Sequence, residues 1–191
     1  DVYALDPSAG GQTVWHKKLG RGGYAGGVHW GMTANKDTLF VPIADTYFPG
    51  LPEAEGFPGL HALAPLAGTV RWYNPALDEC PEDKKPACDP GLSAAATSSN
   101  QLIFAGGFDG LLRAYEASSG QVLWKYNSLG DFETVSGEVG KGGSIESDGP
   151  VLANGHLLVN SGYQFGSRMP GNVLLVFGLK GAGVTEGLAS E

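Results

Sequence analysis

Hydrophobic and polar positions alternate along this chain in short runs that predict β-strands. Residues 122–125 place Val122 and Trp124 at alternate positions, an apolar run fills 173–177, and turn-forming residues separate such stretches. Asn, Asp, Ser and Gly cluster at 35–37, 98–100 and 153–155, where we expect tight turns. Helix-forming runs are almost absent. The pattern therefore predicts an all-β chain of short antiparallel strands.

Pairs of strands are predicted on either side of these three turns, and a further strand is expected near the end of the chain. The expected strands are 28–34 with 38–44, 92–97 with 101–106, 144–152 with 156–161, and finally 172–177.

A repeated segment organises these strands. It occurs at 3–15, 61–72 and 113–124, and in each copy a Gly stands four residues before a Trp. The copies predict a β-hairpin: one strand, a turn whose Gly supplies a positive φ, and a second strand that carries the Trp. Alternation then predicts that Val122 and Trp124 share one face of the second strand.

The repeated tryptophans are Trp15, Trp72 and Trp124, which are 57 and then 52 positions apart. A single four-stranded sheet cannot bury both of its faces, so a large ring at a fixed place in each repeat suits burial against the neighbouring repeat. We expect these three residues to dock successive sheets on one another.

Four strands per repeat of about 40 to 55 residues is typical of β-propeller blades. We interpret residues 1–191 as a single partial propeller domain of about three to four antiparallel blades, with blade pieces at about 1–20, 27–75, 90–127 and 142–179. Open sheet edges favour aggregation. We therefore expect other chain segments to complete the ring, or several copies to close it as a homo-oligomer.

The composition excludes some partners and suggests how the chain arose. Twelve basic and 20 acidic residues give a net charge of −8, which opposes contact with nucleic acid or anionic lipid. No run approaches the roughly 20 apolar residues of a membrane span. The start at Asp1, without Met or a signal peptide, suggests a mature or truncated product.

The two cysteines, Cys80 and Cys88, bracket a polar loop. An unstrained disulfide would stabilise the fold by up to about 2–3 kcal/mol and would persist only in an oxidising compartment. A free thiol pair and a metal site are the alternatives, although the loop holds no His or further Cys. The disulfide is favoured, and it predicts a periplasmic or secreted location.

Two neighbouring residues of the predicted strand 28–34 are candidates for cofactor binding. Trp30 is the one Trp outside the repeat, and an indole face suits stacking on a flat cofactor. His29 suits a hydrogen bond to a carboxylate or proton transfer. Alternation places the two side chains on opposite faces, so only one of them is expected to reach a central channel. The alternatives are that Trp30 plugs the channel or packs between blades, and that His29 is a structural histidine with its hydrogen bonds satisfied.

The stretch 140–148 combines a cation, hydroxyls and carboxylates. Lys141, Ser144 and Glu146 suit an anionic cofactor, or oxygen ligation of calcium. Turn capping by Ser and Asp accounts for the same residues without any ligand. The long connection at 45–59 and the cysteine loop are further candidate binding loops, since long loops on a rigid scaffold often carry binding. Filling of an interface is the alternative for both loops.

The Ala-x-Asp-x-x-x-Gly-x-x-x-Trp pattern resembles the tryptophan-docking motif of quinoproteins, the pyrroloquinoline quinone (PQQ) dehydrogenases with eight-bladed propellers. Residues 98–126 are similar to a late blade of these alcohol dehydrogenases. Residues 26–32, 142–145 and 170–177 resemble the polyvinyl-alcohol-dehydrogenase-like branch of the family.

This resemblance implies a chain that supplies the last blades of a PQQ-dependent alcohol dehydrogenase-like enzyme, acting on a polymeric or secondary alcohol. PQQ and calcium are the implied cofactors. No catalytic carboxylate motif or calcium-ligand pattern is found, and no Cys-x-x-Cys-His haem motif occurs. The chain alone is therefore expected to be inactive, with its catalytic residues elsewhere. A cofactor-free propeller scaffold or binding module, such as the outer-membrane assembly scaffold lipoprotein, carries the same docking motif and is the alternative.

Overall fold

The computed structural model describes residues 1–23, 26–46, 56–163 and 166–179. Strands form nearly all of the regular structure in these ranges, which confirms the all-β prediction. None of the helices in the described ranges is long and apolar enough to cross a membrane.

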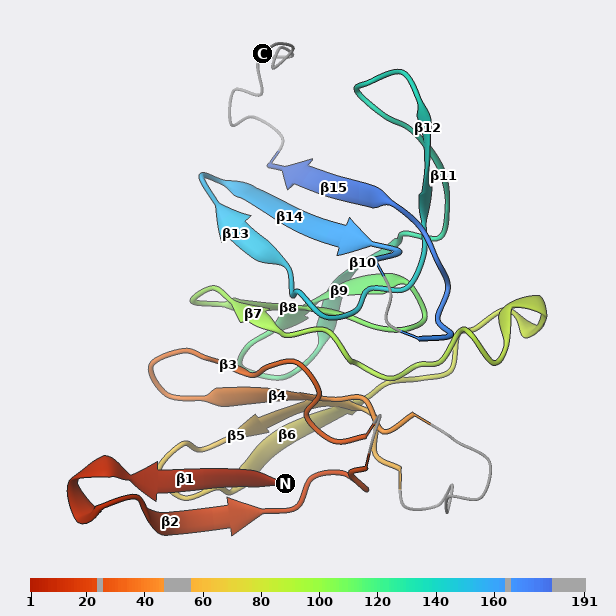
Figure 1. The fold of residues 1–191 in the computed structure, drawn as a ribbon. Helices are drawn as coiled ribbons and strands as arrows, with labels where there is room; N and C mark the ends of the chain where they lie inside the picture. Colours follow the sequence, from red (N-terminus) through yellow and green to blue (C-terminus); the bar gives the residue numbers. More distant parts are fainter. Residues whose placement is uncertain (24–25, 47–55, 164–165, 180–191) are drawn as a thin grey trace.

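Two four-stranded antiparallel sheets form the middle of the molecule (Figure 1). The first has the order β3-β4-β5-β6, with β3 at Thr33–Ala34, β4 at Leu39–Ile43, β5 at Gly59–Leu63 and β6 at Val70–Pro75. The second has the order β7-β8-β9-β10, with β7 at Thr97–Ser98, β8 at Leu102–Gly106, β9 at Leu111–Glu116 and β10 at Val122–Asn127.

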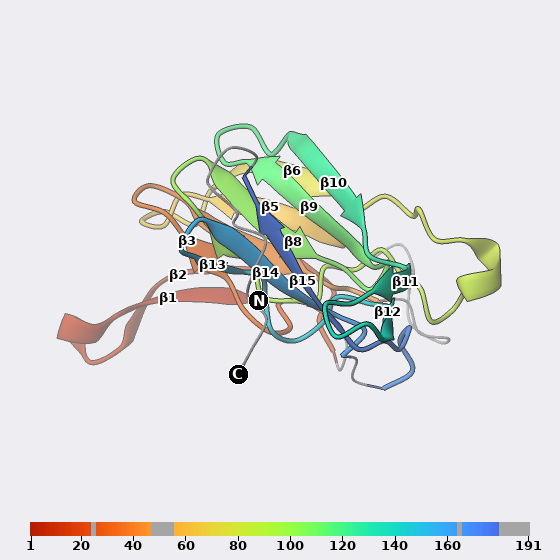
Figure 2. The ribbon, with the colours of Figure 1, turned by 90° about the horizontal axis from the view of Figure 1, so that it is seen from above.

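Smaller sheets flank these two. A hairpin of β1 (Val2–Asp6) and β2 (Gln12–Lys17) lies at one end, and β13 (Val151–Ala153), β14 (His156–Ser161) and β15 (Val173–Gly178) lie at the other. An additional hairpin of β11 (Gly130–Glu133) and β12 (Val139–Gly142), which the alternation pattern did not reveal, stands beside the stack (Figures 1 and 2).

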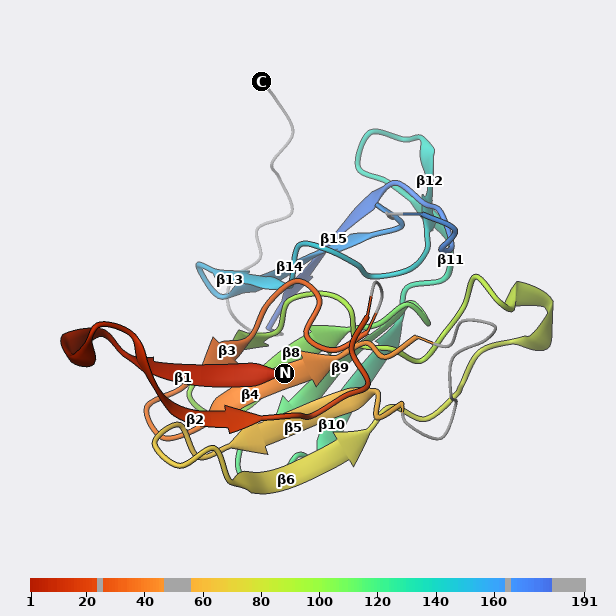
Figure 3. The same cartoon turned by 60° about the horizontal axis from the view of Figure 1, so that its bottom comes forward.

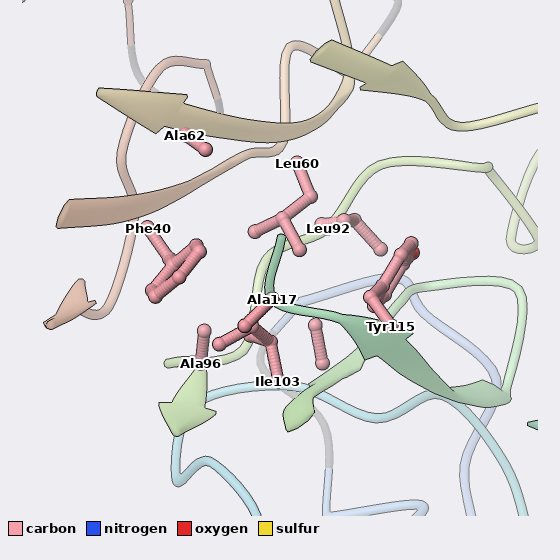
Figure 4. Packing of buried hydrophobic residues seen from close by; sticks show 9 residues of the cluster. Phe40, Leu60, Ala62, Leu92, Ala96, Ile103, Tyr115 and Ala117 are labelled. Atoms are coloured by element: carbon pink, nitrogen blue, oxygen red, sulfur yellow. The ribbon is translucent and has the colours of Figure 1, made fainter. Parts of the chain in front are cut away.

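The sheets pack face to face in chain order, so each interface forms one part of the core. Figure 4 shows the middle interface, where side chains of β4 and β5 meet those of β8 and β9; its buried residues include Phe40, Leu60, Ile103 and Tyr115. Similar apolar clusters join β1–β2 to the first sheet and join the second sheet to β13–β15. Figure 3 shows the order of these neighbouring sheets. Each sheet therefore depends on its neighbours for burial.

The tryptophan of one hairpin lies against the turn of the next. The indole N–H of Trp15 donates to the Pro65 carbonyl at 2.8 Å, and that of Trp72 donates to the Ala117 carbonyl at 3.1 Å. A Cβ built on Gly68 would come within 2.7 Å of the Trp15 ring, and a Cβ on Gly120 within 2.5 Å of the Trp72 ring. Glycine is needed in these turns both for their positive φ and for the space that the ring occupies.

A β-bulge precedes the tryptophan in all three hairpins. The register shifts between Val122 and Trp124, which pair with Tyr115 and Ala114, and equivalent shifts occur in β2 and β6. Tyr115 and Ala114 are neighbours in β9 and therefore point to opposite faces of the sheet. Their partners Val122 and Trp124 consequently point to opposite faces as well. The prediction that Val122 and Trp124 share a face is therefore wrong, because the bulge inserts one residue that simple alternation does not count.

The innermost strands are shorter than predicted. The predicted strands 28–34, 92–97 and 144–152 are observed only as Thr33–Ala34, Thr97–Ser98 and Val151–Ala153, at the end of each predicted range. The segments before them form hydrogen bonds between sheets instead: Ala95 N donates to Ser147 O, and Ala96 N donates to Gly31 O. Apolar alternation cannot distinguish these two hydrogen-bonding patterns.

Cys80 and Cys88 form a disulfide, as predicted. It closes the loop that projects between β6 and β7 (Figure 1). Lys85 within the loop bonds to Asp78 at 2.9 Å and to Glu82 at 3.0 Å. The loop is therefore held by one covalent bond and by exposed ion pairs of its own.

Candidate functional site

The segments that enter the three innermost strands lie side by side and form the candidate site. Hydrogen bonds between Ala96 and Gly31 and between Ala95 and Ser147 hold the backbones of these segments together. Side chains just before the strands therefore come from three different sheets and meet in one place. This convergence positions Trp30 and His29 beside residues that lie far from them in the sequence.

Trp30 lines a pocket of about 700 Å³. Its side chain is 47% exposed, and the opposite wall comes from the segment before β13 and from β14 and β15. The other lining residues are Ala95, Thr97, Ser147, Asp148, Gly149, Pro150, Val151, Leu158, Asn160 and Leu174. The pocket thus combines one indole, a carboxylate and several hydroxyl or amide groups with apolar side chains, the usual make-up of a ligand site.

His29 lies next to Trp30 rather than on the opposite face. The two ring centroids are 5.1 Å apart, and neither residue belongs to a strand, since β3 begins at Thr33. Strand alternation therefore does not apply to these two residues, and of the two only Trp30 lines the pocket. Nδ1 of His29 bonds to Oγ of the buried Ser93 at 2.7 Å, which fixes the orientation of the imidazole.

A buried carboxylate and a guanidinium act electrostatically on His29. Burial lowers the pKa of His29; the negative charge of Glu146 raises it and the positive charge of Arg168 lowers it further. Glu146 is only 3% exposed. The guanidinium of Arg168 lies 3.9 Å from the centroid of the Phe108 ring and donates to Oγ1 of Thr46 at 3.1 Å. A cation, a carboxylate and an imidazole are thereby brought together.

The structure separates the other predicted residues from this group. Lys141 is exposed on the β11–β12 hairpin, and its backbone pairs with Asn172. Ser144 is fully buried, where its hydroxyl donates to Phe108 O at 2.7 Å and accepts from Met169 N at 3.1 Å. These bonds account for Ser144 as a structural residue.

Arg168 and Asp45 were not found from the sequence. Arg168 is the one basic residue in the Gly-rich connection between β14 and β15. No motif surrounds it, so the only available signal was its position near the end of the predicted strand 156–161. Burial alone would raise the pKa of Asp45, but backbone N–H groups that include those of Phe57 and Gly27 outweigh burial and lower it. Asp45 thereby ties the start of the β4–β5 connection to the segment before β3.

The long connection predicted as a binding loop, 45–59, lies partly outside the described residues, which omit 47–55.

The remaining histidines have structural contacts. His61 is buried against the ring of Tyr73 at 4.2 Å, and burial lowers its pKa to about 4. In the described ranges no group of three or more His, Cys, Asp or Glu side chains is arranged to hold a metal ion.

Comparison with known proteins relates this geometry to a family. The sequence profile of the family PQQ_2, described as outer membrane protein assembly factor BamB, matches residues 56–173, which is more than half of the chain. The chain belongs to the PQQ_2 family. The quinoprotein resemblance drawn from the Trp repeat is thereby confirmed.

Curated relatives of this PQQ_2 protein include two polyvinylalcohol dehydrogenases. The protein from Pseudomonas sp. is 34% identical over 189 residues, and that from Sphingopyxis sp. (strain 113P3) is 30% identical over 191 residues. Each alignment covers 94% of this chain and 29% of the relative. The PQQ_2 chain therefore spans less than a third of the length of these relatives.

A solved structure shares the fold. A quinohemoprotein alcohol dehydrogenase from Pseudomonas putida HK5 matches with a TM-score of 0.52 at 17% sequence identity. The match covers 72% of the PQQ_2 chain and 17% of that protein. The predicted partial β-propeller is confirmed.

Proposed function

We propose that this chain is part of a PQQ-dependent alcohol dehydrogenase-like quinoprotein that oxidises a polymeric or secondary alcohol. The pocket beside Trp30 carries the proposal, because it places an exposed indole next to polar groups where three sheets converge. The names of the two relatives, polyvinylalcohol dehydrogenases, support alcohol oxidation. In this proposal the blade pieces are about 1–20, 27–75, 90–127 and 142–179.

The residues present fit one side of a flat, anionic quinone. Trp30 would provide a stacking surface, while Arg168 and His29 would supply positive charge or hydrogen bonds to carboxylates. When bound, PQQ accepts the hydride that is removed from the alcohol. His29, held by Ser93, would orient the cofactor, and Glu146 would keep His29 and Arg168 in place.

The remaining parts of the site would come from outside the described residues. These residues contain no cluster suited to calcium, so its ligands and the base that takes the hydroxyl proton would lie on further blades. The chain alone would then be inactive.

The exposed outer faces of the two end sheets support the presence of further blades. Tyr3, Leu5 and Val14 are 57%, 57% and 59% exposed on the first hairpin, and Val176, which does not line the Trp30 pocket, is 56% exposed on β15. In the interior of the stack, equivalent faces are covered by a neighbouring sheet. We infer that additional blades, from this protein or from further copies of the chain, cover both ends. The disulfide favours a periplasmic or secreted location.

Replacing Trp30 by alanine is expected to abolish PQQ binding, because it removes the only aromatic side chain among the described residues that line the pocket. Binding would be followed by the absorbance change of PQQ during titration in the presence of calcium. Trp30→Phe should retain part of the affinity, and Tyr3→Ala, which removes an exposed ring from the distant hairpin, should retain all of it. Equal PQQ affinity in the Trp30→Ala variant and the parent protein would refute the proposed site.

The affinity for PQQ is expected to increase as the pH falls below about 6.5, the usual pKa of histidine. Burial lowers the pKa of His29, so the ring is neutral at pH 7 and becomes positively charged only at lower pH. Its charge would then attract the carboxylates of PQQ until these carboxylates become protonated. Titrations at several pH values should show this increase, and His29→Asn should remove it. An unchanged profile in His29→Asn would exclude this role.

A cofactor-free scaffold is the second candidate, because the profile that matches this chain is described as an assembly factor. On this alternative the Trp30 pocket would contact a protein partner. Trp30→Ala would then weaken that contact, and neither the parent protein nor the variant would bind PQQ.

A further inference from the structure

A second groove, unrelated to the Trp30 pocket, lies between the two four-stranded sheets. It has a volume of about 510 Å³ and is built by the β3–β4 and β7–β8 turns and by the outer hairpins. Its lining residues are Asn35, Asp37, Thr38, Arg71, Asn100, Gln101, Leu102, Glu116, Ala117, Ser118 and Leu123. Strand β4 begins beside Thr38 and ends next to Asp45, so the groove and the candidate site lie at opposite ends of the strands.

The β-bulges shape this groove. Arg71 and Leu123 are the residues that directly precede Trp72 and Trp124, at the register shifts of β6 and β10. A bulge re-aims the side chain of the inserted residue, and bulges are common next to functional sites. Nη1 of Arg71 donates to the buried Oγ1 of Thr38 at 2.8 Å, which holds the guanidinium at the groove. Leu123 remains 53% exposed.

The groove offers neutral hydrogen-bonding groups beside aliphatic ones. Asn100 and Gln101 are exposed, and among the described residues neither side-chain amide has a hydrogen-bond partner. Asp37 and Glu116 contribute two carboxylates against the single guanidinium of Arg71, so a polyanion would be repelled. Leu102, Ala117 and Leu123 supply methyl groups, and none of the described residues that line the groove is aromatic.

We infer that this groove binds a neutral aliphatic polyol chain, in which hydroxyl and methylene groups alternate. The amides and carboxylates match the hydroxyls, and the leucine side chains match the methylenes. The absence of an aromatic platform among the lining residues disfavours a sugar ring, which normally stacks on one. All of the lining residues belong to two adjacent sheets that this chain supplies itself, so the groove does not depend on further blades. A role in holding a polymeric substrate rests on the proposed function, whereas the binding itself does not.

The test is isothermal titration calorimetry of the purified chain with a short vinyl alcohol oligomer, with dextran and with polyacrylate as separate probes. We expect binding of the vinyl alcohol oligomer alone. Gln101→Ala and Arg71→Ala should each weaken it about fivefold, the effect of losing one ordinary hydrogen bond. Gln12→Ala, a matched change of an exposed glutamine on β2, should leave it unchanged.

Three outcomes would overturn this inference: no heat with the vinyl alcohol oligomer, a preference for dextran or polyacrylate, or equal affinities in Gln101→Ala, Arg71→Ala and the parent chain. Trp30→Ala separates the two hypotheses, because it should lose PQQ binding and keep oligomer binding. If the parent chain binds the oligomer but not PQQ, the groove inference survives while the proposed function fails.

Discussion

Replacing Arg113 by methionine is expected to lower the free energy of unfolding by about 3–5 kcal/mol, because it leaves a buried carboxylate without its cation. Nη2 of Arg113 lies 2.6 Å from Oδ2 of Asp109, and the two side chains are 6% and 1% exposed. Asp109 also accepts the N–H of Leu111 at 3.0 Å, so it cannot turn out to solvent without losing a second bond. Urea unfolding of both proteins would measure the loss.

Lys125→Met provides the matched control for this prediction. Lys125 pairs with Glu79, which also contacts Arg113 at 3.5 Å, but both side chains of the Lys125–Glu79 pair are well exposed. Exposed pairs contribute at most about 1 kcal/mol. A loss at Arg113 no greater than the loss at Lys125 would show that the Asp109–Arg113 pair does not stabilise the second sheet.

Gly120→Ala is expected to destabilise the protein by about 2–4 kcal/mol, through left-handed backbone strain and overpacking together. Gly120 has a φ of +75°, and an added Cβ would lie 2.5 to 2.8 Å from ring carbons of Trp72. The ring cannot retreat easily, since its N–H is bonded to the Ala117 carbonyl in the same turn. Thermal and urea unfolding would both report the change.

The separate cost of the backbone can be measured at Gly155. Its φ is +76°, and a Cβ there would meet nothing within 4 Å. Gly155→Ala should therefore cost only about 1 kcal/mol, the price of the left-handed conformation alone. If the two substitutions destabilise equally, close packing between the Trp72 ring and the turn of the next sheet contributes nothing to the stacking of the blades.

The sequence predicted the hairpins and the contacts of their tryptophans better than the inner strands. The spacing of Gly and Trp reflects a physical requirement, since the turn needs a positive φ and the ring needs the space of a missing Cβ. The inner segments differ because their backbones form hydrogen bonds across sheets before the strands begin. Apolar alternation alone therefore overestimated the lengths of β3, β7 and β13.

The candidate site was only partly predictable for a similar reason. Trp30 and His29 stand out by residue type, and Glu146 by its place in a polar stretch. Ser93 and Arg168 join them only through the packing of separate sheets, which no local pattern encodes. Lys141 looked equivalent to these residues in the sequence, but an additional hairpin places it elsewhere.

Paired native and denaturing mass spectrometry of the purified protein, supplied with PQQ and calcium, tests the central claim most directly. Our account predicts a native species heavier than the 19.8 kDa chain, carrying the mass of PQQ alone or together with the chains that complete the ring, and predicts that denaturation returns the bare chain. A native species that remains a bare 19.8 kDa chain in excess PQQ would contradict the proposal that this arc of blades forms part of a quinone site.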